Sequence, residues 1–210
     1  MKSNLLILGA GGHGRVVADA AESSEAWNKI AFIDEKYPDL GASGRWPVIG
    51  KTADLSELLT EWPDAVVAIG ANTLRLELLK LCSEKGFNVV NIIHTSARVA
   101  EDVSLGNGTV IFASAVINTG ASLGQGCIVN TAASVDHDCS LAEGVHLSPG
   151  VHLGGTVSVG SRSWVGIGSS VVNNIRIGSD VIVGAGAAVI SNVRDNHTVV
   201  GVPAKQITTD

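Results

Sequence analysis

Two patterns of apolar residues divide the chain near residue 90. In the first part, short apolar runs alternate with amphipathic stretches, which is typical of parallel βα units. The pattern predicts strands over residues 4–8, 30–34, 65–69 and 89–93, and helices over residues 13–23, 54–62 and 72–85. Leu74, Leu78 and Leu81 share one face of the last helix, so we expect this face to pack on the sheet.

The second part repeats every six residues. Val, Ile or Leu occupies every sixth position from Ile93 to Val189, and the residue four positions later is mostly small. A helix period of about 3.6 residues or a strand period of two does not produce this spacing, whereas a triangular coil of three hexapeptides does. The repeat therefore predicts a solenoid of about five and a half coils, in which every coil packs on its neighbours.

Each hexapeptide is expected to supply one short strand and one corner. We expect the large aliphatic side chain to fill the corner and the small one to line the wall behind it. A Gly or Asn follows many of the aliphatic residues, as Gly106 follows Leu105 and Asn118 follows Ile117. Both residue types tolerate a positive φ, so we expect them to relieve strain at the corners.

Composition and charge argue against several classes of protein. The formal net charge is −6 and no basic stripe is visible, which argues against sequence-independent binding of nucleic acid. No apolar run approaches the roughly 18 residues of a membrane span. Cys82, Cys127 and Cys139 form no CxxC pair, which fits a reducing compartment, so we expect a cytoplasmic protein.

Residues 9–14 read GAGGHG and follow the first predicted strand. Asp34 lies 20 residues after Gly14, which is the spacing of a dinucleotide-binding fingerprint. In that motif Gly9 allows the tight turn, Gly11 lets a phosphate approach the backbone, and Gly14 packs the helix on the strand. The segment before the repeat is long enough for only one mononucleotide half, so we expect a single nucleotide. A purely structural turn is the alternative.

His137 is the first candidate for a catalytic base. It lies between Asp136 and Asp138, whose carboxylates can raise its basicity and fix its tautomer. A corner histidine in a polar cluster is the structural alternative. Cys127 and Cys139 fall in the small inward register, so we expect them to be buried wall residues and not nucleophiles.

The two parts together resemble a known enzyme family. Residues 93–194 resemble the hexapeptide-repeat acyltransferases, whose fold is a left-handed parallel β-helix, and residues 200–205, VGVPAK, resemble their closing segment. The glycine-rich βα domain, the repeat and the motif VDHD at residues 135–138 are similar to the sialic-acid O-acetyltransferases and the nucleotide-amino-sugar N-acetyltransferases of bacillosamine and perosamine type.

The resemblance implies a division into two domains. Residues 1–90 would form a Rossmann-like α/β domain with a parallel sheet that binds a nucleotide sugar. Residues 91–210 would form a left-handed β-helix acetyltransferase domain with a C-terminal tail. The resemblance also implies a homotrimer whose active sites lie between subunits.

The activity that the resemblance implies is acetyl-CoA-dependent N-acetylation of a UDP-linked 4-amino sugar, without a metal, for surface glycan biosynthesis. His137 would remove the proton as the amine attacks the thioester directly, and the backbone N–H of Gly155 would bind the oxyanion. Asp138 stands where the family has Glu, which leaves a shorter partner for His137.

The resemblance also assigns the other site residues. Binding of the nucleotide sugar is assigned to Gly11, Gly12, His13, Gly14, Asp34, Lys36, Gly70, Asn72, Arg75 and Asn130. Binding of acetyl-CoA is assigned to His146, Gly155, Ile167, Gly168, Ala185, Gly186, Pro203 and Lys205. Lys205 and Arg162 are either phosphate-binding cations or solvated surface charges.

Other functions stay open. A metal enzyme of the γ-carbonic-anhydrase type needs three converging histidines, but the spacings between His137, His146 and His152 do not match that family. A nicotinamide-dependent reductase would use the glycine loop, and a non-enzymatic scaffold needs no reactive groups. Within the resembling group, O-acetylation of sialic acid is the main alternative, because the same base can serve a hydroxyl. We expect His152 on the surface and assign no role to His94 or His197.

Overall fold

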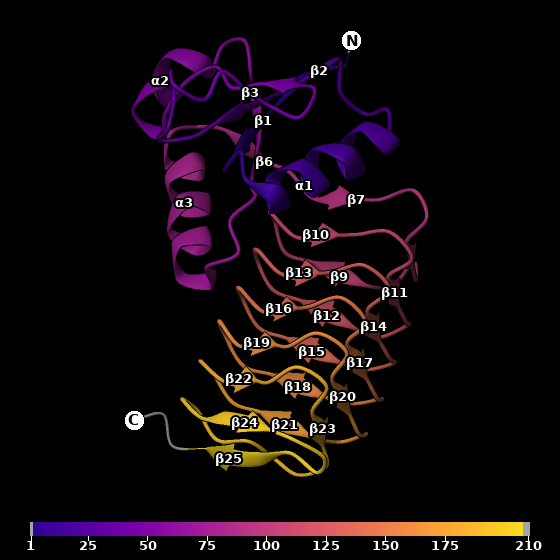
Figure 1. The fold of residues 1–210 in the computed structure, drawn as a ribbon. Coiled ribbons are helices and arrows are strands. Elements are labelled where there is room, and N and C mark those ends of the chain that lie inside the picture. The colour runs from indigo at the N-terminus through magenta and orange to yellow at the C-terminus, as the bar shows by residue number, and fades with distance from the viewer. Residues whose placement is uncertain (1, 208–210) are drawn as a thin grey trace.

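The computed structural model describes residues 2–207 and has an α/β domain at one end of a β-solenoid (Figure 1). The domain contains a four-stranded parallel sheet in the order β2-β1-β5-β6. Its strands are β1 (Asn4–Leu8), β2 (Lys29–Ile33), β5 (Asp64–Val67) and β6 (Asn88–Val89), and its helices are α1 (Gly12–Ser23), α2 (Leu55–Leu58) and α3 (Asn72–Glu84). These elements confirm the predicted parallel βα arrangement.

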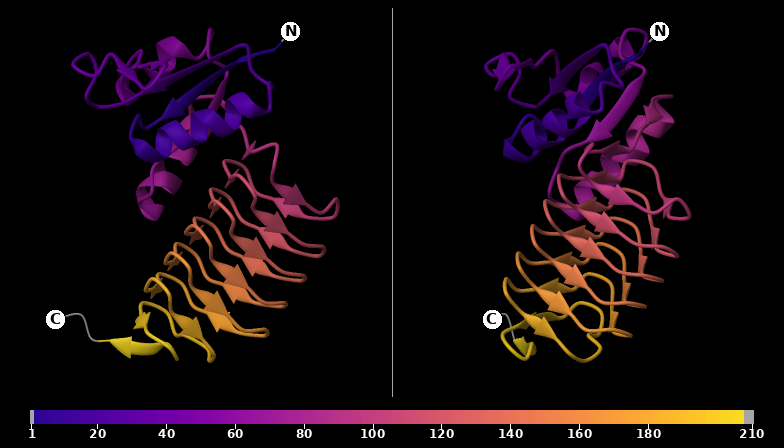
Figure 2. Two further views of the ribbon diagram at one scale, coloured as in Figure 1. Left: turned by 45° about the vertical axis from the view of Figure 1, so that its right-hand side comes forward. Right: turned by 90° about the vertical axis from the view of Figure 1, so that its right-hand side faces the viewer.

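Alternate residues of β1 pack on opposite faces of this sheet. Leu5 and Ile7 belong to the apolar cluster that contains α1, whereas Leu6 and Leu8 belong to the cluster that contains residues of α2 and α3. A strand buried on both faces needs this period of two. The helices therefore cover the two faces, and the carboxyl edge of the sheet faces the solenoid (Figure 2).

Three local predictions differ from the structure. The predicted helix over residues 54–62 is a 3-10 turn (Thr52–Asp54) followed by the single turn of α2. A short hairpin of β3 (Ala42–Ser43) and β4 (Trp46–Pro47) is absent from the predicted pattern. Residues 89–93 are not one strand, because β6 ends at Val89 and the first solenoid strand begins at Ile92.

The buried face of α3 is rotated from the predicted one. Arg75, Leu79 and Cys82 are buried, Leu78 packs only partly, and 44% of Leu74 is exposed. The expectation that Leu74 packs on the sheet is therefore wrong. The helix lies between the sheet and the solenoid, so two neighbours set its inner face.

Between residues 92 and 189, seventeen two-residue strands wind into three parallel sheets, which we call the first, second and third faces. The first face contains β7 (Ile92–Ile93), β10 (Val110–Ile111), β13 (Ile128–Val129), β16 (His146–Leu147), β19 (Trp164–Val165) and β22 (Ile182–Val183), and is extended by β24 (Thr198–Val200) and the antiparallel β25 (Lys205–Ile207). The second face contains β8 (Arg98–Val99), β11 (Val116–Ile117), β14 (Ser134–Val135), β17 (His152–Leu153), β20 (Ser170–Val171) and β23 (Ala188–Val189). The third face contains β9 (Ser104–Leu105), β12 (Ser122–Leu123), β15 (Ser140–Leu141), β18 (Ser158–Val159) and β21 (Arg176–Ile177).

The register confirms the predicted triangular coil. Ile92, Val110 and Ile128 pair across neighbouring coils, so each coil is 18 residues long. Every aliphatic residue of the repeat is the second residue of a strand, and from Val99 onward its side chain lines a wall, whereas Ile93 at the start of the repeat is 36% exposed. The expectation that the aliphatic side chain fills a corner is wrong, because the small residue and the large one flank an outward residue and both point inward.

The glycines that follow the aliphatic residues do not relieve corner strain by a positive φ. Positive φ occurs two residues further on, within the turns, as at Asp138 with φ 57°. A Cβ atom on Gly106 would instead lie 2.4 Å from the backbone nitrogen of Gln125 in the next coil, and one on Gly124 would lie 2.6 Å from that of Glu143. These glycines therefore allow the coils to stack closely.

Small residues complete the solenoid interior. Cys127 and Cys139 are buried, as the register predicts. Burial raises the pKa of the Cys127 thiol to about 12, so this thiol is not a nucleophile near neutral pH. Among residues 2–207, none of the helices has the length and apolar character needed to cross a membrane.

Candidate active site

The glycine loop connects β1 to α1 at the carboxyl edge of the sheet. Gly9 has φ 105°, and a Cβ atom there would lie 2.9 Å from the carbonyl oxygen of Ala68, which agrees with a tight turn. A Cβ atom on Gly14 would lie 2.1 Å from the carbonyl oxygen of Gly9, so the helix packs directly on the loop. A Cβ atom on Gly11 or Gly12 would meet open space. The loop therefore has a packed inner side and a free outer side that a ligand can approach.

Asp34, which follows the end of β2, holds this loop in place through hydrogen bonds. Its Oδ2 atom accepts the backbone N–H of Ala10 at 3.0 Å, and its Oδ1 atom accepts that of Lys36 at 3.1 Å. The hydroxyl of Ser43 in the hairpin donates to the carbonyl of Ala10 at 2.6 Å. A carboxylate oxygen has more than one lone pair, so Asp34 can hold the loop and still accept a bond from a ligand.

Two neutral histidines lie between the domains. His13 on α1 and His146 on the first face have ring centroids 6.4 Å apart, and His13 packs edge-on to Phe112 at 5.5 Å. Burial, and then the charge of Arg75, lowers the pKa of His13 to about 4 and that of His146 to about 3. Within the described residues, neither Nε2 atom has a hydrogen-bond partner. Both are therefore unpaired polar atoms that are shielded from solvent at the contact between the domains.

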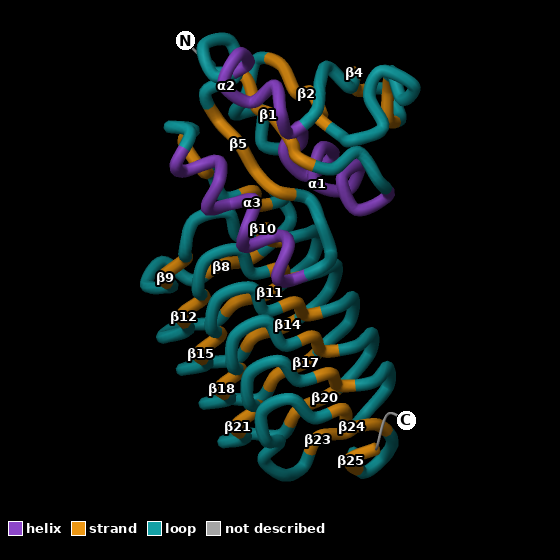
Figure 3. The backbone as a smooth tube through the Cα atoms, turned by 90° about the vertical axis from the view of Figure 1, so that its left-hand side faces the viewer, coloured by secondary structure: helices purple, strands orange, loops and turns teal. Residues whose placement is uncertain are grey.

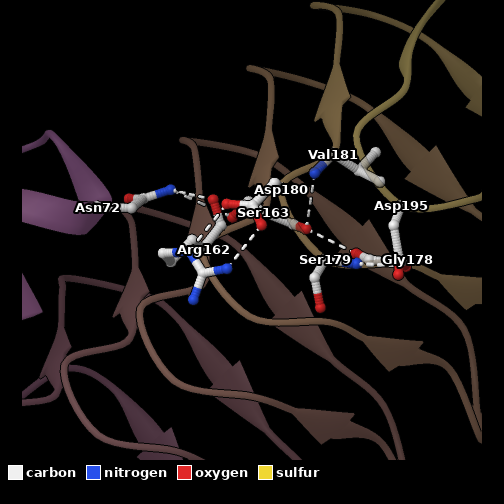
Figure 4. Close-up of polar contacts among 8 residues, drawn as sticks. All are labelled: Asn72, Arg162, Ser163, Gly178, Ser179, Asp180, Val181 and Asp195. Carbon is white, nitrogen blue, oxygen red and sulfur yellow. Dashed lines mark hydrogen bonds and ion pairs between the residues drawn. The ribbon is translucent and has the colours of Figure 1, made fainter.

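An open groove of about 560 Å³ runs between the start of α3 and the first face of the solenoid. Its apolar floor includes Trp164 and Ile182, which are 42% and 43% exposed, and His146 and Gly70 also line it. Asn72 lies at the margin of the groove, and its Nδ2 atom donates to the carbonyl of Arg162 at 2.7 Å (Figure 4). Two residues assigned to substrate, Gly70 and Asn72, thus lie beside one assigned to acetyl-CoA, His146.

Arg162 lies on the same margin of the groove. Its guanidinium pairs with Asp180 through bonds of 2.8 and 2.6 Å (Figure 4). This pairing raises the pKa of Arg162 above its ordinary value and lowers that of Asp180. Because Arg162 is already paired with Asp180, the structure favours a structural role for its guanidinium. A contact between Arg162 and a CoA phosphate, which the sequence also allows, is less favoured.

The predicted contact between Arg75 and the nucleotide sugar is contradicted. The guanidinium is fully buried, and its donors are taken by four backbone carbonyls and by Oδ1 of Asn72. An arginine has five N–H donors, so none is left for a phosphate. Arg75 joins the two domains instead.

His137 lies in the turn between β14 and β15, with its side chain half exposed. Its Nδ1 atom is 2.9 Å from Oδ2 of Asp138, so the shorter carboxylate reaches the imidazole. The bond to Asp138, followed by the charge of Asp136, raises the pKa of His137 above its ordinary value. With Nδ1–H donated to Asp138, the Nε2 atom is free to accept a proton, which is the arrangement of a general base.

The backbone around His137 is also fixed. Its N–H donates to Oδ1 of Asp136 at 2.7 Å, and the amide of Asn118 donates to the same oxygen at 2.9 Å. A Cβ atom on Gly155 would lie 2.4 Å from Nε2 of His137, so the imidazole lies against the Gly155 backbone. The base and the assigned oxyanion donor are therefore neighbours.

The turns between the three faces form three edges of the solenoid, and the remaining assigned residues lie on different edges. The first edge joins the first and second faces, the second edge joins the second and third, and the third edge joins the third and first. His137 and Gly155 lie on the second edge, one coil apart. The turns of the first edge, after β19 and β22, carry Ile167, Gly168, Ala185 and Gly186, and Asn130 follows β13 on the same side. The glycine loop lies over the first face, so one chain does not bring these groups together.

The segment from β24 to β25, which carries Pro203 and Lys205, lies at the end of the solenoid that is distant from the α/β domain (Figure 1). Lys205 lines a pocket of about 210 Å³ together with Arg194 and His197. His152 is exposed on the second face, as expected, and its Nδ1 atom is 2.8 Å from the hydroxyl of Ser134.

Sequence reasoning missed the apolar ladder that faces outward from the first face. Ile92, Val110 and Ile128 are the outward residues of three successive coils, and the α/β domain buries them. Trp164 and Ile182 continue the same column beyond His146 into the groove. In the sequence, a second apolar residue directly precedes the repeated aliphatic residue once every 18 residues. This pattern could have revealed that the α/β domain packs on the first face.

Comparisons with known proteins add to this geometry. Residues 4–81 match the family described as PglD N-terminal domain. The acetyltransferase domain of PglB from Neisseria gonorrhoeae FA1090, solved in complex with acetyl coenzyme A, is 40% identical with a TM-score of 0.95, covering 99% of this chain and 100% of that chain. The chain belongs to the hexapeptide-repeat acetyltransferases of the bacillosamine and perosamine group.

Two further members of this acetyltransferase group are similar to the chain. A mutant of perosamine N-acetyltransferase from Caulobacter crescentus, in complex with CoA and GDP-perosamine, is 37% identical with a TM-score of 0.94, over 99% of this chain and 98% of that chain. UDP-N-acetylbacillosamine N-acetyltransferase from Bacillus subtilis (strain 168) is 36% identical over 112 residues, which is 52% of this chain. The match spans about half (51%) of the length of that curated relative.

The histidines do not favour the metal-enzyme alternative. His137 lies on the second edge, His146 on the first face and His152 on the second face, so the three side chains do not converge. Within residues 2–207, no group of three His, Cys, Asp or Glu side chains is placed to hold a metal ion.

Proposed function

We propose that this acetyltransferase transfers the acetyl group of acetyl-CoA to the amine of a nucleotide-linked amino sugar. The observation that carries the proposal is His137, which bonds to Asp138 through Nδ1 and presents a free Nε2 beside the Gly155 backbone. The Neisseria relative in complex with acetyl coenzyme A and the Caulobacter relative in complex with CoA and GDP-perosamine support both substrates.

The reaction proceeds in one direct displacement. The amine nitrogen attacks the thioester carbonyl carbon, the C–N bond forms, and the C–S bond breaks to release the CoA thiolate. His137 accepts the amine proton at Nε2 and can return it to the departing sulfur. The buried cysteines provide no nucleophile for an acyl-enzyme.

Asp138 and Gly155 assist this base in different ways. Asp138 holds the tautomer of His137 that leaves Nε2 unprotonated, and its charge stabilises the imidazolium that forms. The backbone N–H of Gly155 donates to the oxyanion that develops on the thioester carbonyl. A base with a raised pKa suits a substrate whose ammonium group must lose a proton before it attacks.

The amino sugar enters by the glycine loop. We propose that Gly11, Gly12 and Lys36 contact the diphosphate, that the buried Gly14 keeps the loop in shape for this contact, and that Asp34 accepts a ribose hydroxyl. His13, Gly70, Asn72 and Asn130 would contact the sugar, and His146, which lines the groove, would contact the acetyl donor. A UDP-linked 4-amino sugar is the proposed acceptor, and the Bacillus relative named as a UDP-N-acetylbacillosamine N-acetyltransferase supports this choice.

The active site is completed by a second chain in a homotrimer. His137 on the second edge and the groups on the first edge, which include Ile167, Gly168, Ala185 and Gly186, face different directions in one chain. We propose that the second edge of one subunit faces the first edge of the next, with the pantetheine between them and Pro203 and Lys205 near the phosphates. Three free cysteines support a reducing compartment, such as the cytoplasm, for this step of surface glycan synthesis.

The acceptor is tested by transfer of label from acetyl-CoA to UDP-, dTDP- and GDP-linked amino sugars and to free sialic acid. Labelling of a UDP-linked 4-amino sugar, with far less labelling of the other acceptors, is the expected result. Preferential labelling of sialic acid would establish the O-acetylation alternative. Absence of label on every acceptor would overturn the proposal.

The shared site is tested by mixing two inactive variants, His137→Ala and Gly11→Trp. Each mixed trimer contains sites with an intact loop from one chain and an intact base from the next. Recovery of activity on refolding the variants together is therefore expected. No recovery, with mixed trimers verified by mass spectrometry, would place both groups in one chain.

A further inference from the structure

Helix α3 lies along the third edge of the solenoid (Figure 3). The turn positions of three successive coils on this edge are Gly108, Gly126 and Gly144, all with positive φ. A Cβ atom on Gly126 would lie 2.6 Å from Leu79, and one on Gly144 would lie 2.8 Å from Leu76. Glycine at these positions therefore lets the helix approach the edge closely.

The first turn of the helix donates hydrogen bonds to three successive coils of this edge. Nε of Arg75 donates to the carbonyl of Gly126 at 2.7 Å, and Nη2 donates to that of Gly144 at 2.9 Å. Nδ2 of Asn72 donates to the carbonyl of Arg162 at 2.7 Å. These acceptors are 18 residues apart and so recur once per coil, but a shift of the helix by one coil towards the C-terminus would bring Leu76 from Gly144 against the side chain of Arg162.

The same guanidinium also holds the loop that follows β5. Nη1 of Arg75 donates to the carbonyls of Ile69 at 3.0 Å and Gly70 at 3.2 Å, and Nη2 donates to Oδ1 of Asn72 at 2.9 Å. One buried side chain thus connects two coils of the solenoid to the loop that lines the groove.

The bonding pattern explains why this position suits arginine and not an apolar residue. Arg75 is fully buried, and the acceptors that it contacts are neutral carbonyl groups with no carboxylate among them. Burial of a cation without a counter-ion is unfavourable, and a methionine would avoid it. An apolar side chain or a lysine cannot reproduce the planar guanidinium group with its five N–H donors. Arginine at this site therefore holds the loop by directional hydrogen bonds, which apolar packing alone would not provide.

We propose that Arg75, assisted by Asn72, is a positioning residue that fixes the Gly70 loop, and with it the nucleotide-binding edge, against a particular coil of the solenoid. This inference rests on the proposed function, in which the α/β domain holds the amino sugar while the solenoid holds the base and acetyl-CoA. The position that Arg75 gives this loop determines where the amine lies relative to the acetyl group.

The test compares Arg75→Met with Lys80→Met, which removes an exposed cation from the same helix. For Arg75→Met, kcat/KM for the amino sugar should fall by about 10²-fold, the effect of roughly 1 Å of misplacement. The dissociation constant of acetyl-CoA, measured by calorimetry without amino sugar, should stay unchanged, because its proposed contacts are all on the solenoid and none is on the Gly70 loop. Lys80→Met should behave as the wild type. An Arg75→Met protein that keeps kcat/KM, or that loses affinity for both substrates equally, would overturn the proposal.

Two milder variants cover the case in which Arg75→Met does not fold. Arg75→Lys keeps the charge but loses the planar fork, and Gly144→Ala presses on Leu76 without touching the groove. Both should show the same selective loss for the amino sugar, in smaller amount. Wild-type kinetics in both variants would contradict the inference.

Hydrogen exchange separates this inference from the proposed function. In Arg75→Lys, the amides of residues 69–73 should exchange faster than in the wild type, while those near His137 should not change. This readout does not depend on activity. A wild type that acetylates no amino sugar would refute the proposed function alone, whereas unchanged exchange over residues 69–73 would refute the positioning role alone.

Discussion

Nδ1 of His137 lies 2.9 Å from Oδ2 of Asp138, its neighbour in the sequence. Adjacent residues of a strand point to opposite faces, but this pair occupies a corner turn, where Asp138 has φ 57°. A Cβ atom on Gly120, one coil earlier, would lie only 2.5 Å from Oδ1 of Asp138. The glycine therefore gives the carboxylate room to bond to the imidazole.

Replacement of His137 should remove the base without removing the substrate sites. We expect His137→Ala to lower kcat by roughly 10²–10⁴-fold, with little change in the dissociation constant of the nucleotide sugar. The matched control is His94→Ala, which removes a histidine that has no assigned role. Steady-state rates and calorimetry check the two expectations. Near wild-type turnover in His137→Ala would exclude it as the base.

Asp138→Asn should change the pH dependence of the reaction. Asparagine tolerates positive φ and can accept the Nδ1–H bond through its side-chain oxygen, so mainly the negative charge is lost. Asp138 raises the pKa of His137, so the pKa of His137 should fall in the variant. The acidic limb of kcat/KM against pH should therefore move to lower pH. A limb that stays in place would show that Asp138 is not the electrostatic partner.

Acidification should destabilise the fold through the two buried histidines. The pKa values of His13 and His146 in the folded chain are lowered to about 4 and about 3, against about 6.5 when unfolded. Between these values the unfolded chain binds protons that the folded chain does not, so the free energy of unfolding falls as the pH drops. The thermal midpoint, followed by circular dichroism, should therefore be lower at pH 5 than at pH 7.

The His146→Gln variant tests the origin of that pH dependence. One titrating group is removed, so its midpoint should fall less between pH 7 and pH 5 than the wild-type midpoint does. His152→Gln, which changes an exposed histidine, should retain the wild-type difference. An equal fall in wild type and His146→Gln would mean that His146 does not contribute.

The solenoid could be predicted from the sequence because its repeat is local. Each inward residue, such as Val135 or Leu153, has the same relation to its own strand, so a period of six fixes the coil. Side-chain periodicity does not reveal where the turn lies within the hexapeptide. For this reason the pattern predicts Leu105 in a corner although it lies in a wall, and predicts a positive φ at Gly106 that this residue does not have.

The task of Arg75 could not be predicted, because it depends on contacts between the domains. Its acceptors at Gly126 and Gly144 lie 51 and 69 residues further along the chain. The family resemblance assigns Arg75 to the nucleotide sugar, and only the docking of α3 shows that its donors are already used. Local geometry was more predictable, as Gly9 and Gly14 show.

The glycines of the loop should separate stability from binding. Gly14→Ala places a methyl group against the carbonyl of Gly9, where a Cβ atom would lie 2.1 Å away, so we expect a loss of about 1–3 kcal/mol, as for overpacked sites. Gly12→Ala meets open space and should gain up to about 1 kcal/mol from helix propensity. Its methyl group would nevertheless stand where a phosphate approaches the backbone, so the KM for the nucleotide sugar should rise. Thermal unfolding and steady-state kinetics on the two variants check this. A Gly12→Ala enzyme with unchanged KM would argue that the loop is only a structural turn.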